Sequence, residues 1–290
     1  MNIKKFLKEK IFAVESNKYA NKIYLNSLLN IAICRAAASA STRKINEKNP
    51  ESWEFSGFSQ NGEDGIIDFL TSSLKETNRF FIEIGSGTGL ENNTSYLAHI
   101  KKFAGLQIEG NRSEFEQANL IKPWLVENIN SFVNAGNVVD ILKKALYLNP
   151  DLFSIDIDGM DYYLAKQLLD NGLLPKILIV EYNSAFGPEK SLTIPYDENF
   201  NMFKTEFPYL YYGVSLAGWK KLLANYGYLF VTVESNGVNA FFVQKDEFPA
   251  GFFEGLLGNN FKENVHQLRT FKKDFKGQFE MIKHLSFYEI

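Results

Sequence analysis

Five acidic residues stand at or beside the ends of short apolar runs, where their side chains could do chemistry. They are Glu83, Glu109, Asp156, Asp158 and Glu181. Apolar runs of this kind form buried parallel strands, and ligands of open α/β sheets bind outside the carboxyl ends of such strands. Carboxylates placed there can accept hydrogen bonds from ligand hydroxyls, act as a general base or hold Mg²⁺.

Three acids follow a single predicted strand, in the order Asp156, Asp158 and Asp161. Charge at the end of a buried strand is costly unless it has a partner or a task. Asp161 begins the next predicted helix, so N-capping explains it. For Asp156 and Asp158 we predict a role in a ligand site.

The glycine-rich turn that follows Glu83 indicates where a ligand would lie. Gly85, Gly87 and Gly89 alternate with Ser86 and Thr88 between an apolar strand and the start of a helix. Glycines let the backbone turn sharply and let a ligand approach main-chain N–H groups. The G-x-G-x-G spacing departs from the dinucleotide pattern G-x-G-x-x-G. Tight packing of strand on helix is the alternative explanation.

Glu109 ends the second predicted strand, 26 residues after Glu83. In a doubly wound sheet, an acid at this position can accept from both hydroxyls of a bound ribose. Glu83 before the glycine turn and Glu109 at the ribose position could thus both serve one nucleoside ligand. This pairing favours the interpretation of the glycine turn as part of a ligand site.

A polar segment at 58–64 leads into a predicted helix that ends near Leu74, and it contains Gln60, Glu63 and Asp64. One interpretation is a capped helix start, with acids near the positive end of the helix dipole. The other is that these side chains lie beside the glycine turn and help to close a cofactor pocket.

The strands and helices that position these residues are predicted to alternate along most of the chain. The sequence predicts a mostly parallel, seven-stranded Rossmann-like α/β sheet. Its strands are expected at 79–84, 104–109, 129–133, 152–158, 176–181, 229–234 and 239–244, with helices at 94–100, 114–120, 138–147, 161–169 and 215–225. The last two strands form an antiparallel hairpin after the last of these helices, which a flavodoxin-like sheet lacks.

Three domain segments are expected. Residues 1–54 form a helical N-terminal extension and linker, 55–248 the main domain, and 249–290 a helical C-terminal extension to which we assign no chemistry. Residues 184–211 form a long insertion, and such loops usually cover a binding site.

Composition excludes several classes of function. The 290 residues carry a net charge of −3, so no basic field points to nucleic acid. The single cysteine, Cys34, excludes an intramolecular disulfide and a cysteine-cluster zinc site. A cytoplasmic location is the default.

The apolar run 23–40 is interrupted by polar residues, which predicts an amphipathic helix. Peripheral membrane contact through that helix and a homodimer are both compatible with the sequence.

The ordered motifs resemble the FkbM-type branch of the class I S-adenosylmethionine (SAM) methyltransferases. The resemblance covers residues 58–245 and rests on Ser-Gln-Asn-Gly-Glu-Asp at 59–64, Phe-Ile-Glu-Ile-Gly-Ser-Gly-Thr-Gly at 81–89, and the stretches 93–97, 105–111, 155–161 and 179–183. Two positions depart from the family pattern: Asp158 stands where Glu is typical, and Asn183 where a longer or ring side chain is common. The acceptor pocket is therefore expected to differ from that of better-known members.

The resemblance implies roles for particular residues. SAM would contact Gln60, Asp64, Glu83, Gly85, Ser86, Gly87, Gly89, Thr94, Glu109, Gly110, Asn111 and Asp156. Acceptor binding would involve Asp158, Tyr182, Asn183 and Tyr196, and the candidate catalytic acids are Asp156, Asp158 and Glu181. Crowded carboxylates in a poorly solvated cleft have a raised pKa, which suits a base.

The function implied is SAM-dependent O-methyl transfer to a sugar hydroxyl of a surface glycan, a glycolipid or a nucleotide-linked precursor. A magnesium-assisted variant would place Mg²⁺ on Asp156, Asp158 and Glu181, where the ion lowers the pKa of an acceptor hydroxyl. A binding or scaffold protein that keeps the fold without turnover is an alternative of another class. The glycine spacing and the terminal hairpin disfavour an enzyme that uses NAD or a nucleotide sugar.

Overall fold

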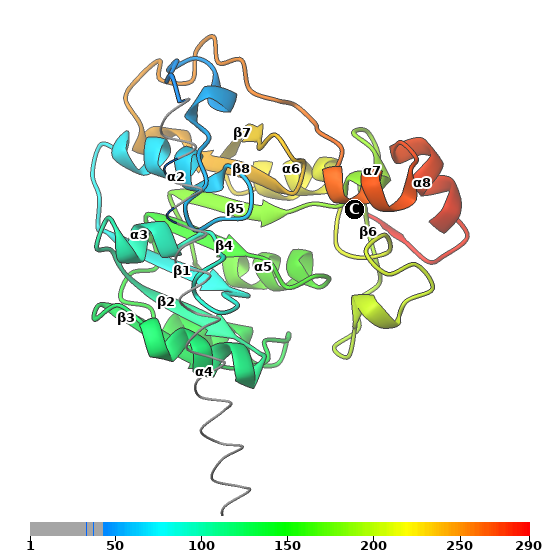
Figure 1. The fold of residues 1–290 in the computed structure, drawn as a ribbon, viewed down its shortest axis with the longest axis horizontal. Helices are drawn as coiled ribbons and strands as arrows, with labels where there is room; N and C mark the ends of the chain where they lie inside the picture. Colours follow the sequence, from blue (N-terminus) through cyan, green and yellow to red (C-terminus); the bar gives the residue numbers. More distant parts are fainter. Residues whose placement is uncertain (1–32, 34–36, 38–42) are drawn as a thin grey trace, which may run out of the picture.

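Seven strands form one twisted sheet in the computed structural model, which describes residues 33, 37 and 43–290 (Figure 1). The strands are β1 (Phe80–Ile84), β2 (Ala104–Glu109), β3 (Val126–Asn130), β4 (Leu152–Ile155), β5 (Ile177–Glu181), β7 (Tyr228–Val233) and β8 (Asn239–Gln244). Their order is β3-β2-β1-β4-β5-β8-β7. The first five are parallel, and β8 runs antiparallel to both β5 and β7. This is the expected Rossmann-like fold, a mostly parallel seven-stranded sheet with a terminal antiparallel hairpin.

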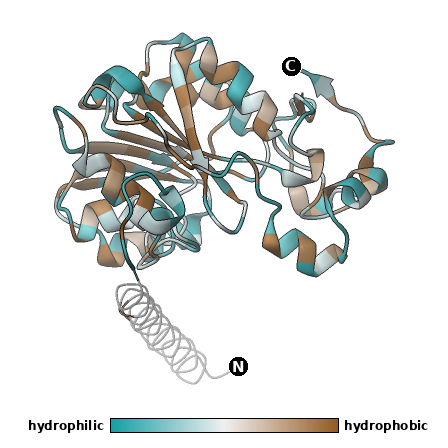
Figure 2. Cartoon of the chain, turned by 90° about the horizontal axis from the view of Figure 1, so that it is seen from above, coloured by the Kyte–Doolittle hydropathy of each residue, from teal (hydrophilic) through white to brown (hydrophobic). Residues whose placement is uncertain are grey.

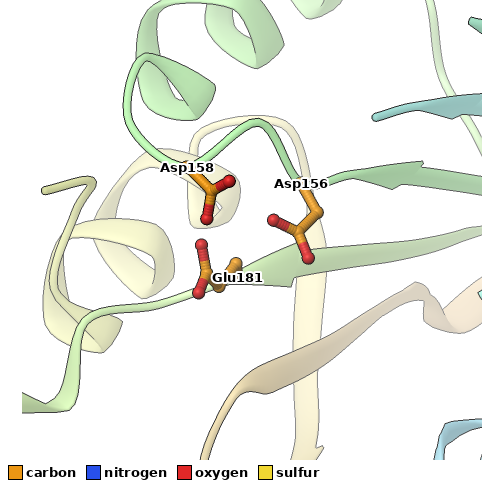
Figure 3. Close-up of side chains that lie close together, drawn as sticks. All are labelled: Asp156, Asp158 and Glu181. Carbon is orange, nitrogen blue, oxygen red and sulfur yellow. The ribbon is translucent and has the colours of Figure 1, made fainter. Parts of the chain in front are cut away.

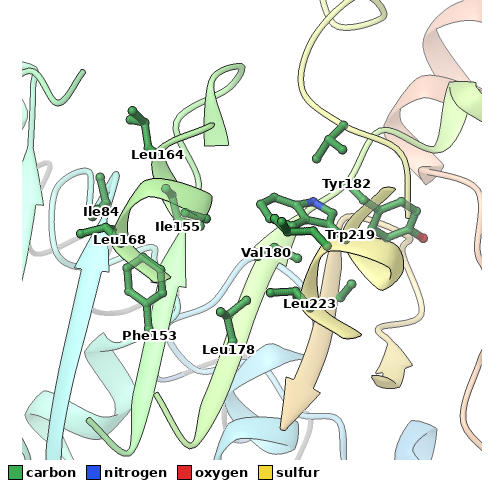
Figure 4. Close-up of a cluster of buried hydrophobic side chains, with 14 of the residues drawn as sticks. Ile84, Phe153, Ile155, Leu164, Leu168, Leu178, Val180, Tyr182, Trp219 and Leu223 are labelled. Atoms are coloured by element: carbon green, nitrogen blue, oxygen red, sulfur yellow. The ribbon is translucent and has the colours of Figure 1, made fainter. Parts of the chain in front are cut away.

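Alternation along the strands divides the core into two layers. Along β1, Phe80, Ile82 and Ile84 face one layer, and Phe81 faces the other. The first layer includes side chains of α5 (Asp161–Asp170) and α6 (Leu216–Ala224), with Trp219 of α6 fully buried (Figure 4). The second includes side chains of η1 (Pro50–Trp53), α2 (Glu63–Ser72) and α3 (Ser95–His99). Because both faces are covered, the central strands β1, β4 and β5 are mostly apolar, and Figure 2 shows the sheet largely in brown between its flanking helices.

The insertion after β5 and the C-terminal extension pair with each other. The insertion contains η3 (Ser184–Phe186), β6 (Leu192–Thr193) and η4 (Met202–Lys204); the extension follows η5 (Lys245–Glu247) and contains α7 (Val265–Phe271), α8 (Phe275–Ile282) and β9 (Tyr288–Glu289). β6 pairs antiparallel with β9. The insertion and the part of the extension from α7 onward therefore form one lobe beside the sheet, drawn in yellow-green, orange and red in Figure 1, whereas Phe252 and Phe253 pack against the second core layer.

Several element boundaries differ from those expected. β3 begins and ends three residues earlier than expected, and Ser131 N–H still donates to Glu109 O at 3.0 Å, which completes the bonding between β2 and β3. β4 ends at Ile155, so the acids after it lie in a loop. The helix expected at 138–147 is only a 3-10 turn, η2 (Val138–Lys143), which begins with two β-branched valines of low helix propensity. α4 (Arg112–Ile121) follows β2 as expected.

Most of the N-terminal segment predicted as a helix lies outside the described residues. Within the described part of the chain, no helix combines the length and the apolarity that crossing a membrane requires.

Candidate functional site

The glycine turn after β1 is held against both neighbouring strands. Gly85 N–H and Ser86 N–H donate to Ile108 O of β2, at 2.9 and 3.1 Å. Gly85 has φ +86°, and a Cβ there would lie 1.7 Å from the main-chain oxygen of Asp156 after β4. Only glycine permits this close approach, so the turn brings the end of β1 against the loop that carries the candidate catalytic acids.

Glu109 lies at the mouth of this turn. Its Oε2 accepts from Gly87 N–H at 2.7 Å and its Oε1 from Asn111 N–H at 2.6 Å. Asn111 in turn caps α4 by accepting from Ser113 N–H at 2.9 Å. Each carboxylate oxygen can accept a further hydrogen bond. Glu109 is therefore held in place by backbone donors and can still accept from ligand hydroxyls.

A cavity of about 750 Å³, here called the first cavity, opens beside the glycine turn. Its walls come from the carboxyl ends of β1, β2, β4 and β5, from the segment after β3 and from the insertion. Eight acidic residues line it, and none of the lining residues is Lys or Arg: Glu91, Glu109, Glu114, Asp156, Asp158, Glu181, Asp197 and Glu198. Such a cavity favours a ligand that carries positive charge.

Asp156, Asp158 and Glu181 all line the first cavity, and Figure 3 shows their carboxylates directed toward one another. One carboxylate oxygen from each lies within 4.8 Å of the others. Tyr212 OH donates to Glu181 Oε1 at 3.0 Å. Asp158 has a left-handed backbone with φ +58°, a conformation that Asp adopts more readily than most residues. This backbone geometry aims its carboxylate at the other two acids.

Burial and neighbouring carboxylates raise the pKa of all three acids. Burial and then the charge of Asp158 raise the pKa of Asp156 well above its ordinary range. Burial and then Asp156 do the same to the pKa of Glu181, and burial and then the charge of Asp161 raise the pKa of Asp158 to about 6. Like charges this close cannot all stay ionised without a cation or a shared proton. The cluster can therefore take up a proton or hold a cation.

A second cavity, of about 580 Å³, adjoins the first. The two share Gln60, Asp158, Glu181, Phe203 and Val238 as lining residues. The far wall of the second cavity comes from α7 and from Met202 to Tyr209 of the insertion. Asp158 and Glu181 therefore stand between two cavities that are built from different parts of the chain.

The structure brings together most of the residues singled out from the sequence. Those lining the first cavity are Gln60, Gly85, Gly87, Glu109, Gly110, Asn111, Asp156, Asp158, Glu181 and Tyr196. Tyr196 OH also accepts from Ala135 N–H at 3.0 Å, which ties the insertion to the segment after β3. Those lining neither cavity are Asp64, Glu83, Ser86, Gly89, Thr94, Tyr182 and Asn183.

The residues near Glu83 hold the backbone around the glycine turn. Glu83 accepts from Asn93 N–H at 2.9 Å and from Thr94 Oγ1 at 2.5 Å, which ties β1 to the start of α3. Burial raises the pKa of Glu83 to about 7. Ser86 is buried, and Gly89 N–H donates to Ser86 O at 3.1 Å within the turn. None of these residues lines the first cavity, but Glu83 lines a smaller pocket beside it that shares Gly85 and Asp156 with it.

Asp64 closes the polar segment before α2. Its Oδ2 accepts from the N–H groups of Gly57, Phe58 and Ser59 at 2.7, 2.6 and 3.1 Å. Asp64 thus lies in the first turn of α2, near the positive end of the helix dipole, but it does not cap the helix, whose N-cap residue is Gly62; its carboxylate instead fixes the loop before the helix. Gln60, by contrast, lines both cavities.

Asp161 was expected to be an N-cap, but the N-cap residue of α5 is Met160. The carboxylate of Asp161 accepts from Ile157 N–H at 2.8 Å and Gly159 N–H at 2.9 Å. It therefore shapes the loop that presents Asp158, because both donors precede the helix.

Tyr182 and Asn183, expected at the acceptor, are buried structural residues. Tyr182 is fully buried, and its OH donates to Lys262 O at 2.6 Å. Asn183 Nδ2 donates to Leu210 O and Tyr212 O at 2.8 and 2.9 Å, and its Oδ1 accepts from Ala185 N–H. The polar end of β5 thus anchors the insertion, because its side chains find backbone partners there.

The sequence interpretation missed several lining residues, among them the acids Glu91 and Glu114 of the first cavity. Phe132 and Asn134, after β3, line the first cavity; the rule that strands deliver residues to their carboxyl edge could have found them. His266 and Arg269 of α7 line the second cavity. No motif marks them, because α7 reaches the site through contacts across about 80 residues of sequence.

The spacing of the carboxylate oxygens in the acid cluster is close to that of ligands around Mg²⁺. Oxygen ligands at about 2.1 Å in an octahedron lie roughly 3 to 4.2 Å apart. The three carboxylate oxygens lie within 4.8 Å of one another, which is slightly wider than this octahedral spacing. Small side-chain movements would bring Asp156, Asp158 and Glu181 into range, and all three are the oxygen ligands that Mg²⁺ prefers.

No family model and no curated protein matches the chain. Several solved methyltransferase structures are similar over part of it. The METTL16 methyltransferase domain is 15% identical with a TM-score of 0.39; the match covers 61% of this chain and 63%, less than two thirds, of that chain. PaMTH1 of Podospora anserina, bound to S-adenosylhomocysteine (SAH), is 18% identical over 58% of this chain and 72% of that chain, with a TM-score of 0.38.

The N-terminal domain of EvdMO1 in the presence of SAH and D-fucose is 13% identical over 63% of this chain and 82% of that chain, with a TM-score of 0.38. The fold assignment rests on the strand order described above and not on these alignments.

Proposed function

We propose that this protein is a SAM-dependent O-methyltransferase. The observation that carries the proposal is the arrangement of the two cavities: an acidic cavity beside the glycine turn meets a second cavity at Asp158 and Glu181. SAM carries a sulfonium and an ammonium against one carboxylate, so its net positive charge suits the first cavity. A volume of about 750 Å³ lies in the usual range for small-molecule sites.

Glu109 would accept hydrogen bonds from the ribose hydroxyls. Its carboxylate is already oriented by Gly87 N–H and Asn111 N–H, so little ordering is needed when a ligand binds. Gly85 and Gly87 leave the backbone open to the ligand on the same side. Bound SAM would supply the methyl group from its sulfonium.

Asp158 would take the proton of the acceptor hydroxyl. It faces both cavities, so it can touch an acceptor whose oxygen points at the methyl donor. A pKa of about 6 makes its carboxylate a stronger base than an ordinary aspartate, yet leaves it mostly ionised at neutral pH. Glu181, fixed by Tyr212, would hold the acceptor beside it. The main contribution of the fold is to hold the two reactants in line.

The acceptor that we propose is a sugar hydroxyl of a glycan, a glycolipid or a nucleotide-linked precursor, on the basis of the FkbM-type motif order. A magnesium-assisted variant is a second candidate, favoured by the convergence of Asp156, Asp158 and Glu181. When bound there, Mg²⁺ would lower the pKa of the acceptor hydroxyl.

Calorimetric titration with SAH tests the proposal, first with Mg²⁺ and again with EDTA. We expect micromolar binding in both conditions. The ribose would bind at Glu109, at the end of β2, and Glu109 is not one of the three acids that would hold Mg²⁺. Methyl transfer to a panel of sugars with [methyl-³H]SAM, with and without EDTA, then decides whether a metal takes part. Absence of SAH binding would contradict the proposal, and binding without any turnover would favour a scaffold protein.

A further inference from the structure

The second cavity is lined by a cation as well as by the proposed catalytic acids. Asp158 and Glu181 line it together with His266 and Arg269 of α7, and the guanidinium of Arg269 supplies the positive charge. The guanidinium of Arg269 forms no ion pair with any carboxylate in the described part of the chain. A positive group that faces a cavity without a partner in the protein can serve a negatively charged ligand.

α7 is fixed to the end of β5 by a buried network. Gln267 Nε2 donates to Asn183 Oδ1 at 3.1 Å and to Tyr209 O at 2.9 Å, and Gln267 Oε1 accepts from Ser184 Oγ at 2.8 Å. Asn264 N–H donates to Ser184 Oγ at 2.8 Å. These bonds hold the backbone that carries Arg269, so its place in the cavity wall is set by the fold.

Asn264 adds a polar group of its own to the wall. It is 6% exposed and lines the second cavity. Its Oδ1 caps α7 by accepting from His266 N–H and Gln267 N–H, which orients the amide. Its Nδ2 has no acceptor among the residues that the structure describes, so it remains available to a ligand oxygen.

Aromatic rings complete the same wall. The ring of Tyr209 packs edge-on against Phe203 at 5.3 Å and against His266 at 5.4 Å, and all three residues line the second cavity. Ring faces suit the C–H face of a sugar, while the donors beside them suit oxygen atoms. The wall therefore combines an apolar platform with a cationic end.

We propose that α7 forms an anion-binding subsite, so that the acceptor is a sugar that bears a phosphate or a carboxylate. This rests on the proposed function, since the second cavity is the acceptor site only if the first binds SAM. Repulsion from Asp158 and Glu181 keeps the anionic group at the far wall. The acceptor is thereby oriented with its hydroxyl toward the acids and its anionic group toward Arg269.

The test uses the full chain saturated with SAH and ligand-observed NMR titration at low salt. The probes are glucose 1-phosphate, glucuronate and glucose. We expect at least one anionic sugar to bind about tenfold or more tightly than glucose, as for a charge-assisted hydrogen bond. Binding of glucose 1-phosphate alone identifies phosphate as the recognised group, and binding of glucuronate alone identifies a carboxylate.

The variant Arg269→Gln should reduce that preference to less than threefold, with SAH affinity unchanged. Lys283→Gln is the matched control, since Lys283 lies in the same extension, is exposed and lines neither cavity. Equal affinity for charged and neutral sugars, no binding of either anionic sugar, or a preference that survives Arg269→Gln would each overturn the inference. Failure of SAH to bind would instead contradict the proposed function.

Discussion

The two cavities share Asp158 and Glu181 but are built in different ways. The first lies at the carboxyl edge of the parallel sheet, and eight acids line it with no Lys or Arg. The second takes its far wall from the insertion and from α7, which adds Arg269 and His266. The sheet thus provides the proposed methyl-donor site, while segments outside the sheet shape the proposed acceptor site. Donor and acceptor binding should therefore respond to different mutations.

The largest effect is expected where the cavities meet. Asp158→Asn removes the proposed base, so kcat should fall at least about a hundredfold. SAH affinity, measured by calorimetry, should stay within about threefold because Glu109 is untouched. Asp140→Asn is the control, since Asp140 is an exposed aspartate that lines neither cavity. Full turnover by Asp158→Asn would remove its assigned role.

Glu109→Ala should affect the first cavity alone. Loss of hydrogen bonds to a charged acceptor costs about 1.5–3 kcal/mol, or about 10- to 150-fold in SAH affinity. Glu116→Ala, an exposed site on α4, should leave the affinity unchanged. Unchanged calorimetric affinity of Glu109→Ala would mean that the ligand does not reach the end of β2.

Asn183→Ala separates a structural role from a substrate contact. The amide of Asn183 serves the backbone at Leu210, Tyr212 and Ala185, so its loss leaves buried polar groups without partners. We expect the free energy of unfolding to fall by about 2 kcal/mol and the acceptor KM to rise, with SAH affinity retained. Denaturant unfolding measures the first effect. Unchanged stability with a raised KM would instead support direct contact with the acceptor.

The smallest expected effect is a pH-dependent change in stability at Glu54, which lies near Val238, a residue that lines both cavities. Glu54 Oε1 accepts from Ser235 N–H at 2.9 Å, beside the hairpin turn that carries Val238. Burial raises the pKa of Glu54 from 4.5 to about 7. The folded protein therefore holds this proton more tightly than the unfolded chain, and it loses stability as the pH rises between these values.

Glu54→Gln keeps the acceptor oxygen and cannot ionise. The variant should gain about 1 kcal/mol over the wild type at pH 8, or about 2–4 °C in Tm, and much less at pH 5. Thermal unfolding at both pH values measures this. An equal difference at the two pH values would show that ionisation of Glu54 has no part in it.

Apolar runs and turn glycines were enough to predict the sheet, its terminal hairpin and the meeting of Asp156, Asp158 and Glu181. Each of these follows from short-range pattern plus the rule that parallel strands end at one edge. The sequence could not separate acids that line the first cavity from acids that lie outside it and bind backbone and hydroxyl groups nearby. Glu83 and Asp64 look like Glu109 in sequence, but N–H groups and hydroxyls from nearby loops surround them.

The part of the second cavity that α7 forms was missed for a different reason. Gln267 bonds with Asn183 and Ser184 across more than 80 residues, and no local pattern predicts such a contact. The C-terminal extension, which carries no recognisable motif, therefore became interpretable only when its place beside β5 was known.

A crystal structure of the protein with SAH tests the central claim most directly. The account predicts adenosine in the first cavity, with its ribose on Glu109, its base beside the segment 131–134 and its sulfur directed toward Asp158. The second cavity should remain free for an acceptor. SAH bound against α7 in the second cavity, or a ribose that does not contact Glu109, would contradict the account.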